Sequence, residues 1–413
     1  MSIDNSIFSE IPEKNLKKWP SFTVFVSTLL IQITSLMFGF NLRLLTDFQT
    51  FILAIILADF ILFGLFFVSG YVGMKKRLPT ATLYSRIFGN LGCKIVMLLM
   101  LPIGLIWMAW MTEMVANSLL GLYPSLNYLY LVILIISVSV LSSIKDIKGM
   151  EISSYIQVPI VLLMIITACI RLFVNGVKVA DICPLEKINL YQSVSYVLLT
   201  WINFLPFYSD YTRFVKSKKD LTLSTGICWG IIYSLVMIAG GLFASCGGNN
   251  FDLIKVLRIA GIPVFVAVII MFLCTWTFND RSLYAYSIAI NFIAGKEKYK
   301  KIFIIIGGAV AVVLAYFGIN NRILTILNGI GAIFVPLLAV FIHFFYVSSI
   351  NRSEEERERH LFNYQPFISW LFGVLIGCLT NNKLILSFVA SFTMCYLFDK
   401  LAPFKLAKRE ITR

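Results

Sequence analysis

The chain is poor in charge and almost without histidine. Only 14% of its 413 residues are charged and two are histidines, whereas 59% are hydrophobic and the mean hydropathy is +0.86. A soluble domain of this size needs a polar surface, which this composition does not supply. The two histidines and eight cysteines show no metal-ligand spacing, and no nucleophile motif is present. The sequence therefore predicts neither a soluble protein nor an enzyme.

Long apolar runs with short breaks fill the sequence from Phe22 to Phe398. A hydrocarbon core of about 30 Å needs about 20 helical residues, and lipid offers the backbone no other hydrogen-bond partner. Alternating segments of about ten residues, typical of membrane barrels, are not evident. The sequence therefore predicts an all-α membrane protein with about twelve spans, at residues 22–43, 51–74, 94–118, 126–144, 152–174, 191–212, 221–245, 262–293, 301–318, 323–347, 366–382 and 384–400.

The formal net charge of +14 would suit a nucleic-acid partner, but its placement points to the lipid bilayer instead. Lysines and arginines gather before the first span, after every even-numbered span and at the C-terminal end, and the intervening loops have few. Such a bias marks the cytoplasmic loops of membrane proteins. We therefore expect a multi-pass protein of the cell membrane with both termini in the cytoplasm and no nucleic-acid partner.

The spans divide the chain into five parts. We expect a cytoplasmic tail over 1–21, a ten-helix core over 22–347, a cytoplasmic linker over 348–365, two accessory helices over 366–400 and a tail over 401–413. Five spans in each half of the core suit an inverted repeat, in which the first helix of each half is often broken. Gln32 and Ser35 in the first span and Asn203 and Pro206 in the sixth suit such breaks. A simple proline kink is the alternative.

Four charged residues, Asp59, Glu113, Asp280 and Arg281, fall inside predicted spans. A charge at the centre of a membrane helix costs at least about 2.5–3.5 kcal/mol on insertion scales, so each indicates function or internal pairing. Glu113 and Asp280 are our candidates for carrying a coupling proton, and a structural hydrogen bond is the alternative for both. Asp280 and Arg281 could also neutralise each other, although adjacent side chains diverge on a helix.

Tryptophans recur beside polar residues on three spans. Trp107 lies on the third, Trp201 lies beside Asn203 on the sixth, and Trp276 lies beside Thr277 and Asn279 on the eighth. Aromatic rings would sandwich a flat heteroaromatic solute, and amides and hydroxyls would pair with its edge. The alternative is that these rings contact lipid or pack in the core.

Four stretches resemble bacterial cytosine permeases, members of the nucleobase:cation symporter (purine–cytosine permease) family. They are SGYVGMKKRLPTATLYSRIFGNLG (Ser69–Gly92), SDYTRFVKSKKD (Ser209–Asp220), FLCTWTFNDRSLYAYSIAINFIAGKEKYKK (Phe272–Lys301) and NGIGAIFVPLLAVFIHFF (Asn328–Phe345). The resemblance implies a LeuT-like fold, a 5+5 inverted repeat followed by two C-terminal helices. It also implies a solute site between spans one, three, six and eight, with solute contacts at Trp107, Thr200, Trp201, Asn203, Phe204, Gln32 and Cys274. Asn279, beside Trp276 on span eight, is a further candidate contact.

The resemblance also implies a sodium site between the first and eighth spans. It would use backbone carbonyls of the first span, the Cys274 carbonyl, the Thr277 hydroxyl and a second hydroxyl at the next position, where this sequence has Phe278. A phenyl ring offers no oxygen to a hard cation. Cys274 also stands where the cytosine permeases carry an asparagine, and Arg281 replaces a neutral residue. These departures affect both the ion and the solute.

The sequence therefore predicts a symporter with a monomeric transport unit and no cofactor other than a coupling cation, Na+ or H+. Its solute would be a nucleobase or related heterocycle, such as cytosine or a pyrimidine vitamin precursor. A non-transporting membrane receptor or sensor built on a transporter scaffold is the alternative.

Overall fold

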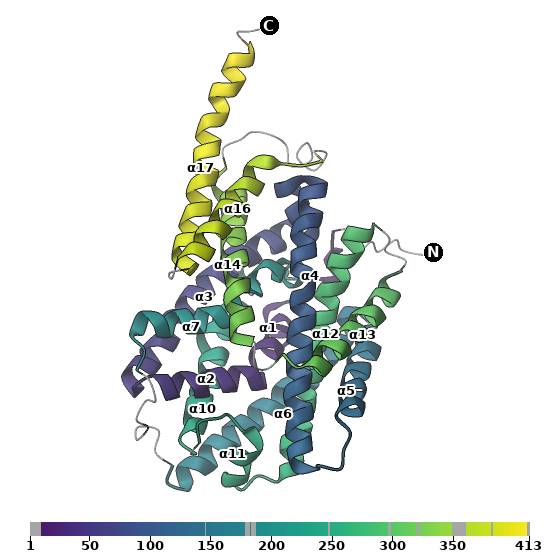
Figure 1. Ribbon diagram of the computed structural model, residues 1–413, viewed down its shortest axis with the longest axis vertical. Coiled ribbons are helices and arrows are strands. Elements are labelled where there is room, and N and C mark those ends of the chain that lie inside the picture. The colour runs from purple at the N-terminus through teal and green to yellow at the C-terminus, as the bar shows by residue number, and fades with distance from the viewer. Residues whose placement is uncertain are drawn as a thin grey trace.

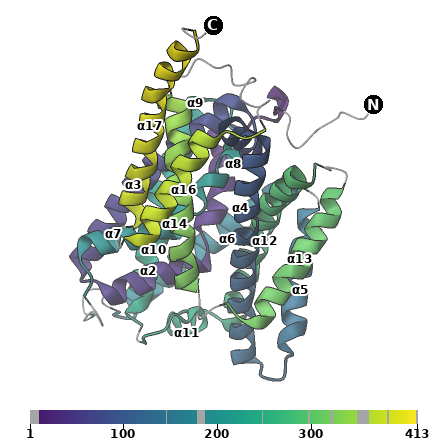
Figure 2. The same ribbon diagram turned by 45° about the horizontal axis from the view of Figure 1, so that its top comes forward.

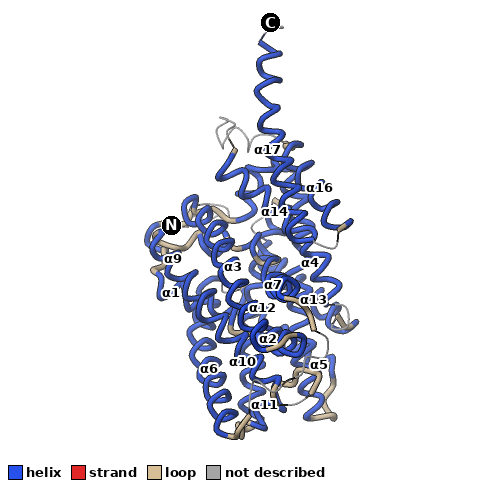
Figure 3. Tube along the Cα trace, turned by 90° about the vertical axis from the view of Figure 1, so that its left-hand side faces the viewer, coloured by secondary structure: helices blue, strands red, loops and turns tan. Residues whose placement is uncertain are grey.

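The computed structural model describes residues 10–144, 146–177, 182, 187–246, 248–295, 299–319, 323–348, 361–380 and 383–410. Every regular element within these ranges is helical, apart from one isolated bridge between the backbones of Lys17 and Val215 (Figure 3). The expected all-helical class is therefore what the structure has.

Eight of the described helical segments are long and apolar enough to cross a membrane, and the bent pair α1 (Trp19–Leu30) and α2 (Ile33–Leu45) makes up to nine. Two further apolar helices, α5 (Tyr128–Ser143) and α16 (Tyr364–Leu379), are shorter. Each predicted span coincides with one of these segments or, for residues 191–212, with a broken helix. The number of crossings, about twelve, stays a prediction.

Helix ends follow from local sequence. Helix α3 (Phe48–Lys76) begins after Asp47, whose carboxylate accepts a hydrogen bond from the Thr50 backbone N–H at 2.9 Å. Helix α5 begins after Asn127, whose side chain accepts from two backbone N–H groups of the first turn. Helix α12 (Val264–Ala294) ends at Gly295, which adopts a φ of 62°. These are ordinary caps for the unpaired backbone groups at helix ends.

The centre of the molecule is built around α12. This helix packs against α4 (Thr80–Leu122), α5 and α6 (Asp146–Val174), and α13 (Lys300–Phe317) lies beside α5 at one side (Figure 2). Helix α2 packs against α10 (Tyr233–Ala244), which continues α9 (Lys218–Ile227) through the π-helical turn η4 (Cys228–Ile232). Helix α1 packs against α6, α9 and α12, and α7 (Leu190–Ile202) packs against α3 and α14 (Ile323–Ile342).

The C-terminal helices form a group of their own. Helix α14 (Ile323–Ile342) continues into the π-helical turn η7 (His343–Val347) and packs against α16 and α17 (Lys383–Glu410). The Trp370 indole N–H donates to the Ile333 carbonyl at 2.9 Å and so joins α16 to α14. Helix α17 extends beyond the rest of the molecule and beyond residue 400, where the last span was expected to end (Figure 1). Most of the predicted linker 348–365 lies outside the described residues.

The segment before α1 is tied to the helix bundle. The Lys17 backbone N–H donates to the Phe214 carbonyl at 2.6 Å, and the Lys216 N–H donates back to the Lys17 carbonyl at 2.9 Å. The Lys17 ammonium lies 2.6 Å from the carboxylate of Glu151 on α6. This segment, with η1 (Glu13–Asn15), therefore joins the start of α1 to α6 and to the residues between α8 (Ser209–Thr212) and α9.

Candidate functional site

The first break lies between α1 and α2, which meet at a bend of 57°. Ile31 and Gln32 leave the helical conformation, with φ/ψ of −85°/67° and −120°/156°. The freed Ile31 carbonyl accepts a hydrogen bond from the Gln157 side-chain amide of α6 at 2.8 Å. The Gln32 amide folds back onto the Thr28 carbonyl. The break falls at the predicted position, and Ser35 lies in the first turn of the helix that follows it.

The second break interrupts the sixth span. Helix α7 (Leu190–Ile202) ends at Asn203, and the chain continues through the short turn η3 (Leu205–Phe207), which contains Pro206, into α8. Proline cannot donate a backbone hydrogen bond and clashes with the preceding turn, which accounts for the interruption. The Asn203 amide nitrogen is buried and has no hydrogen-bond partner in the described part of the chain.

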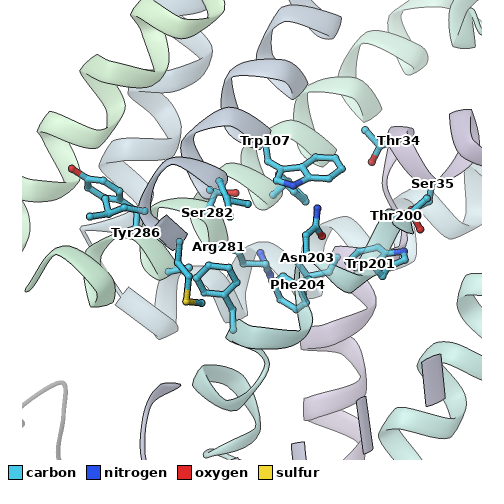
Figure 4. A pocket seen from close by; sticks show the side chains of 18 of the residues that line it. Thr34, Ser35, Trp107, Thr200, Trp201, Asn203, Phe204, Arg281, Ser282 and Tyr286 are labelled. Atoms are coloured by element: carbon cyan, nitrogen blue, oxygen red, sulfur yellow. The ribbon is translucent and has the colours of Figure 1, made fainter. Parts of the chain in front are cut away.

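The two breaks, α4 and α12 enclose a cavity of about 60 Å³ (Figure 4). Five of the eight predicted solute contacts line it: Trp107, Thr200, Trp201, Asn203 and Phe204. Phe278 also lines it, with its ring 6.0 Å from that of Trp107. The remaining lining residues are Leu29, Thr34, Ser35, Phe38, Met100, Leu101, Ile103, Gly104, Phe207, Arg281, Ser282, Ala285 and Tyr286.

The cavity's aromatic walls are supported from behind. Trp201 packs edge-on against Trp229 and Tyr233, with ring centroids 5.2 and 5.8 Å away. The Thr200 hydroxyl lies 2.8 Å from the Tyr233 hydroxyl and 2.6 Å from the Val197 carbonyl. Trp107 packs on Trp110 at 5.2 Å. Because neighbouring rings hold both tryptophans, a solute would meet preformed aromatic surfaces.

The other three predicted solute contacts do not line the cavity. Gln32 and Cys274 lie at the junction of α1, α6 and α12, where the Cys274 thiol is 3.5 Å from the Gln157 amide nitrogen. The Asn279 amide donates to the Thr112 hydroxyl of α4 at 3.2 Å. The structure therefore places Cys274 and Asn279 in contacts between helices, whereas the Gln32 amide bonds back to its own segment.

The cavity also contains residues that the motifs did not single out as solute contacts. Phe278, Arg281, Ser282 and Ala285 of α12 line it together. Their spacing of three, four and seven residues puts them on one face of a helix, so helical periodicity counted from Phe278 would have found them. Gln157 was detectable only as one of several polar residues in its span.

The oxygens that the resemblance assigns to sodium contact protein groups instead. The Thr277 hydroxyl lies 2.9 Å from the Gln157 side-chain oxygen and 3.0 Å from the Cys274 carbonyl, and the Ile31 carbonyl accepts from Gln157. Phe278, at the position of the second hydroxyl, faces the cavity. The described residues therefore do not fit the oxygen cage that a hard cation requires.

The two candidate proton carriers do not line the cavity. The Glu113 carboxylate accepts from the Ile319 backbone N–H at 2.7 Å, beyond the end of α13. The Asp280 carboxylate accepts from the hydroxyls of Ser142 and Ser143 of α5 at 2.7 and 3.3 Å. Each carboxylate is thus engaged with a structural partner, and a role in coupling stays a prediction.

No family model matches the sequence. The cytosine permease of Escherichia coli K12 is 26% identical over 332 residues, which cover 78% of this chain and 76% of the permease. The structure is similar to that of Mhp1, a nucleobase-cation-symport-1 family transporter, in a closed conformation with bromovinylhydantoin bound. The TM-score is 0.80 at 14% sequence identity, and the match covers 95% of this chain and 94% of Mhp1. A Na+-coupled sialic acid symporter in a substrate-bound outward-open state has a TM-score of 0.71, 14% identity and coverage of 92% and 89%.

These similarities confirm the resemblance that the four motifs indicated and the predicted LeuT-like fold class. The relatives are transporters rather than enzymes, in agreement with the sequence. The chain is a multi-pass helical membrane protein related to the cytosine permeases, and it has the fold of the nucleobase-cation-symport-1 family transporter Mhp1.

Proposed function

We propose that this protein imports a nucleobase or a related flat heterocycle across the cell membrane by symport. The observation that carries the proposal is the cavity between two broken helices, where Trp107 and Trp201 are both exposed to the same enclosed space. The relatives' names, cytosine permease and nucleobase-cation-symport-1 transporter, support the same class of solute.

Recognition would combine stacking with a few polar contacts. Trp107 on α4 and Trp201 and Phe204 beside the second break offer ring faces, and Asn203 offers an amide (Figure 4). A buried amide nitrogen without a partner is costly, and a carbonyl oxygen or ring nitrogen of the solute would pair with it. Cytosine and pyrimidine vitamin precursors carry such acceptors on the ring edge.

Transport would follow from the two breaks. In inverted-repeat transporters the solute site lies near the bilayer midplane between the discontinuous helices, and one group of helices moves against the other around it. Here, residues from both breaks and from α4 and α12 line the cavity, so motion of α1 and the sixth span relative to α4 and α12 would open it. Na+ or H+ would drive uptake, with a single chain as the transport unit.

Uptake into proteoliposomes tests the proposal. With an inward gradient of both protons and sodium, we expect accumulation of at least one radiolabelled member of a panel that includes cytosine, uracil, purines and pyrimidine vitamin precursors. Protein-free liposomes are the control. Specific binding of a heterocycle to the purified protein without accumulation would favour the receptor alternative, and neither binding nor uptake would contradict the assignment of the solute class.

The proposed orientation has its own test. Both termini are expected in the cytoplasm, and the loop at Pro124–Ser125, exposed between α4 and α5, is expected outside. An epitope tag inserted after Ser125 should bind antibody on intact spheroplasts, and a tag at the C-terminus should bind only after permeabilisation. The reverse pattern would show that the orientation is wrong.

A further inference from the structure

A side-chain amide connects helices α1, α6 and α12 where the three meet. The Gln157 side chain of α6 donates to the Ile31 carbonyl of α1 at 2.8 Å and accepts from the Thr277 hydroxyl of α12 at 2.9 Å. Gln157 is fully buried. One side chain thus connects the carbonyl freed by the first break to the hydroxyl of the eighth span, the two groups between which a sodium ion was expected.

A guanidinium lies one helical turn further along α12. The Arg281 side chain, 1% exposed, donates to the Thr277 carbonyl at 2.6 Å and lies within 3.5 Å of the Phe25 carbonyl of α1. It also reaches the Met150 carbonyl at 3.3 Å and the Ser154 hydroxyl at 2.5 Å, both on α6. Arg281 therefore contacts backbone oxygens or hydroxyls of the same three helices as Gln157.

We propose that Gln157 and Arg281 take the place of a coupling sodium ion at this junction, so that solute binding and transport do not require sodium. The inference concerns how the proposed transport is driven and rests on that proposed function. Sodium needs several free oxygens, and Ile31, Thr277 and Cys274 are engaged with the protein's own groups, while position 278 is a phenyl ring. A fixed guanidinium in a low-dielectric interior also repels a second cation nearby.

The Arg281 side chain also borders the solute cavity, where its Nε–H has no hydrogen-bond partner in the described part of the chain. In the proposed arrangement Arg281 is a positioning residue that holds α1, α6 and α12 together beside the solute without an added ion. Its charge stays in place through the transport cycle, so the energy for accumulation comes from another gradient.

The first test compares salts with the wild-type protein. We expect the melting temperature of the purified protein and the affinity of the best-bound heterocycle to be the same in sodium, potassium and N-methylglucamine chloride, and uptake to persist without sodium. Coupled ligands typically change one another's affinity by about 5- to 150-fold, so a sodium-specific gain of about fivefold or more would overturn the inference. A sodium-specific rise in melting temperature would do the same, because an ion that binds the folded state stabilises it.

The salt dependence of melting separates this inference from the proposed function. If no heterocycle is accumulated in any salt, the proposed function fails, but a sodium-insensitive melting temperature still supports the junction described here. If uptake occurs only with sodium, the proposed function stands and the inference fails.

Variants test the two side chains. Gln157→Ala combined with Phe278→Thr and Arg281→Ala frees the Ile31 and Thr277 oxygens, adds a hydroxyl and removes the guanidinium, and we expect its melting temperature to be higher in sodium than in potassium. Arg281→Ala should lower the melting temperature equally in all salts, and Arg281→Lys should recover part of the loss because it retains a cation. A melting temperature of Arg281→Ala equal to wild type, or a loss in Arg281→Ala that sodium alone reverses, would contradict the bridging role of Arg281.

Discussion

Replacing Trp107 with alanine is expected to weaken binding of the transported heterocycle by about 5- to 150-fold, since stacking of a base on an aromatic side chain contributes roughly 1–3 kcal/mol by alanine substitution. Trp107 is 8% exposed, and that exposed surface faces the cavity. Trp110 and Phe278 pack beside its ring, and neither replaces its face if the indole is removed. Trp107→Phe should retain part of the affinity.

The measurement is the dissociation constant of the best-bound solute on purified protein, with uptake as a second readout. Trp276→Ala is the matched control, because Trp276 is a half-buried tryptophan on α12 that does not line the cavity. Both variants should melt as single folded species before their affinities are compared. An equal loss of affinity in the two variants, or no loss in Trp107→Ala, would show that Trp107 does not stack on the solute.

Adding a methyl group at Gly240 is expected to prevent correct packing of the first broken helix. A Cβ at Gly240 of α10 would lie 2.1 Å from the Leu36 carbonyl oxygen of α2, and a Cβ at Gly39 of α2 would lie 2.1 Å from the Met237 carbonyl oxygen of α10. Both atoms in the way are backbone, so no side-chain rotation relieves the clash. Small residues at such crossings let membrane helices approach closely.

We expect Gly240→Ala to cost about 3 kcal/mol or more, at the upper end of the range for overpacking, because α2 and α10 must separate. The yield of monodisperse protein in detergent and its melting temperature measure the effect, which should also reduce solute binding since α2 carries Thr34 and Ser35 of the cavity wall. Gly230→Ala is the control, because a Cβ at Gly230 meets nothing within 4 Å. Similar behaviour of the two variants would contradict the tight crossing.

Local sequence was a good guide to the helices and to both breaks. Apolar length and the cost of unpaired backbone groups in lipid determine where helices form, and Pro206 interrupts one of them for a reason that lies within a single turn. Trp107, Trp201 and Asn203 were identifiable because aromatic and amide groups stand out in an apolar chain, and the family resemblance assigned them to one solute site. Their meeting in one cavity depended on the fold.

Contacts between distant helices could not be predicted from the sequence, as three residues show: Cys274, Asn279 and Gln157. Cys274 lies one turn before the cavity residue Phe278 but contacts Gln157 of α6, and Asn279 follows Phe278 directly but contacts Thr112 of α4. Gln157 contacts Ile31 across 126 positions and Thr277 across 120. A position in the sequence does not show which of these distant groups share a junction.

The sequence by itself therefore determined a multi-span helical membrane protein, because helix formation in lipid follows from hydrophobic length, and it indicated where the two helices are interrupted. The solute site of aromatic and amide groups stays a prediction. Only the tertiary structure decided which side chains face the cavity and what lies between α1, α6 and α12. There the physical reason is burial: Arg281 and Gln157 lie in a low-dielectric interior where each polar group must find a partner, and the partners come from helices far apart in the chain.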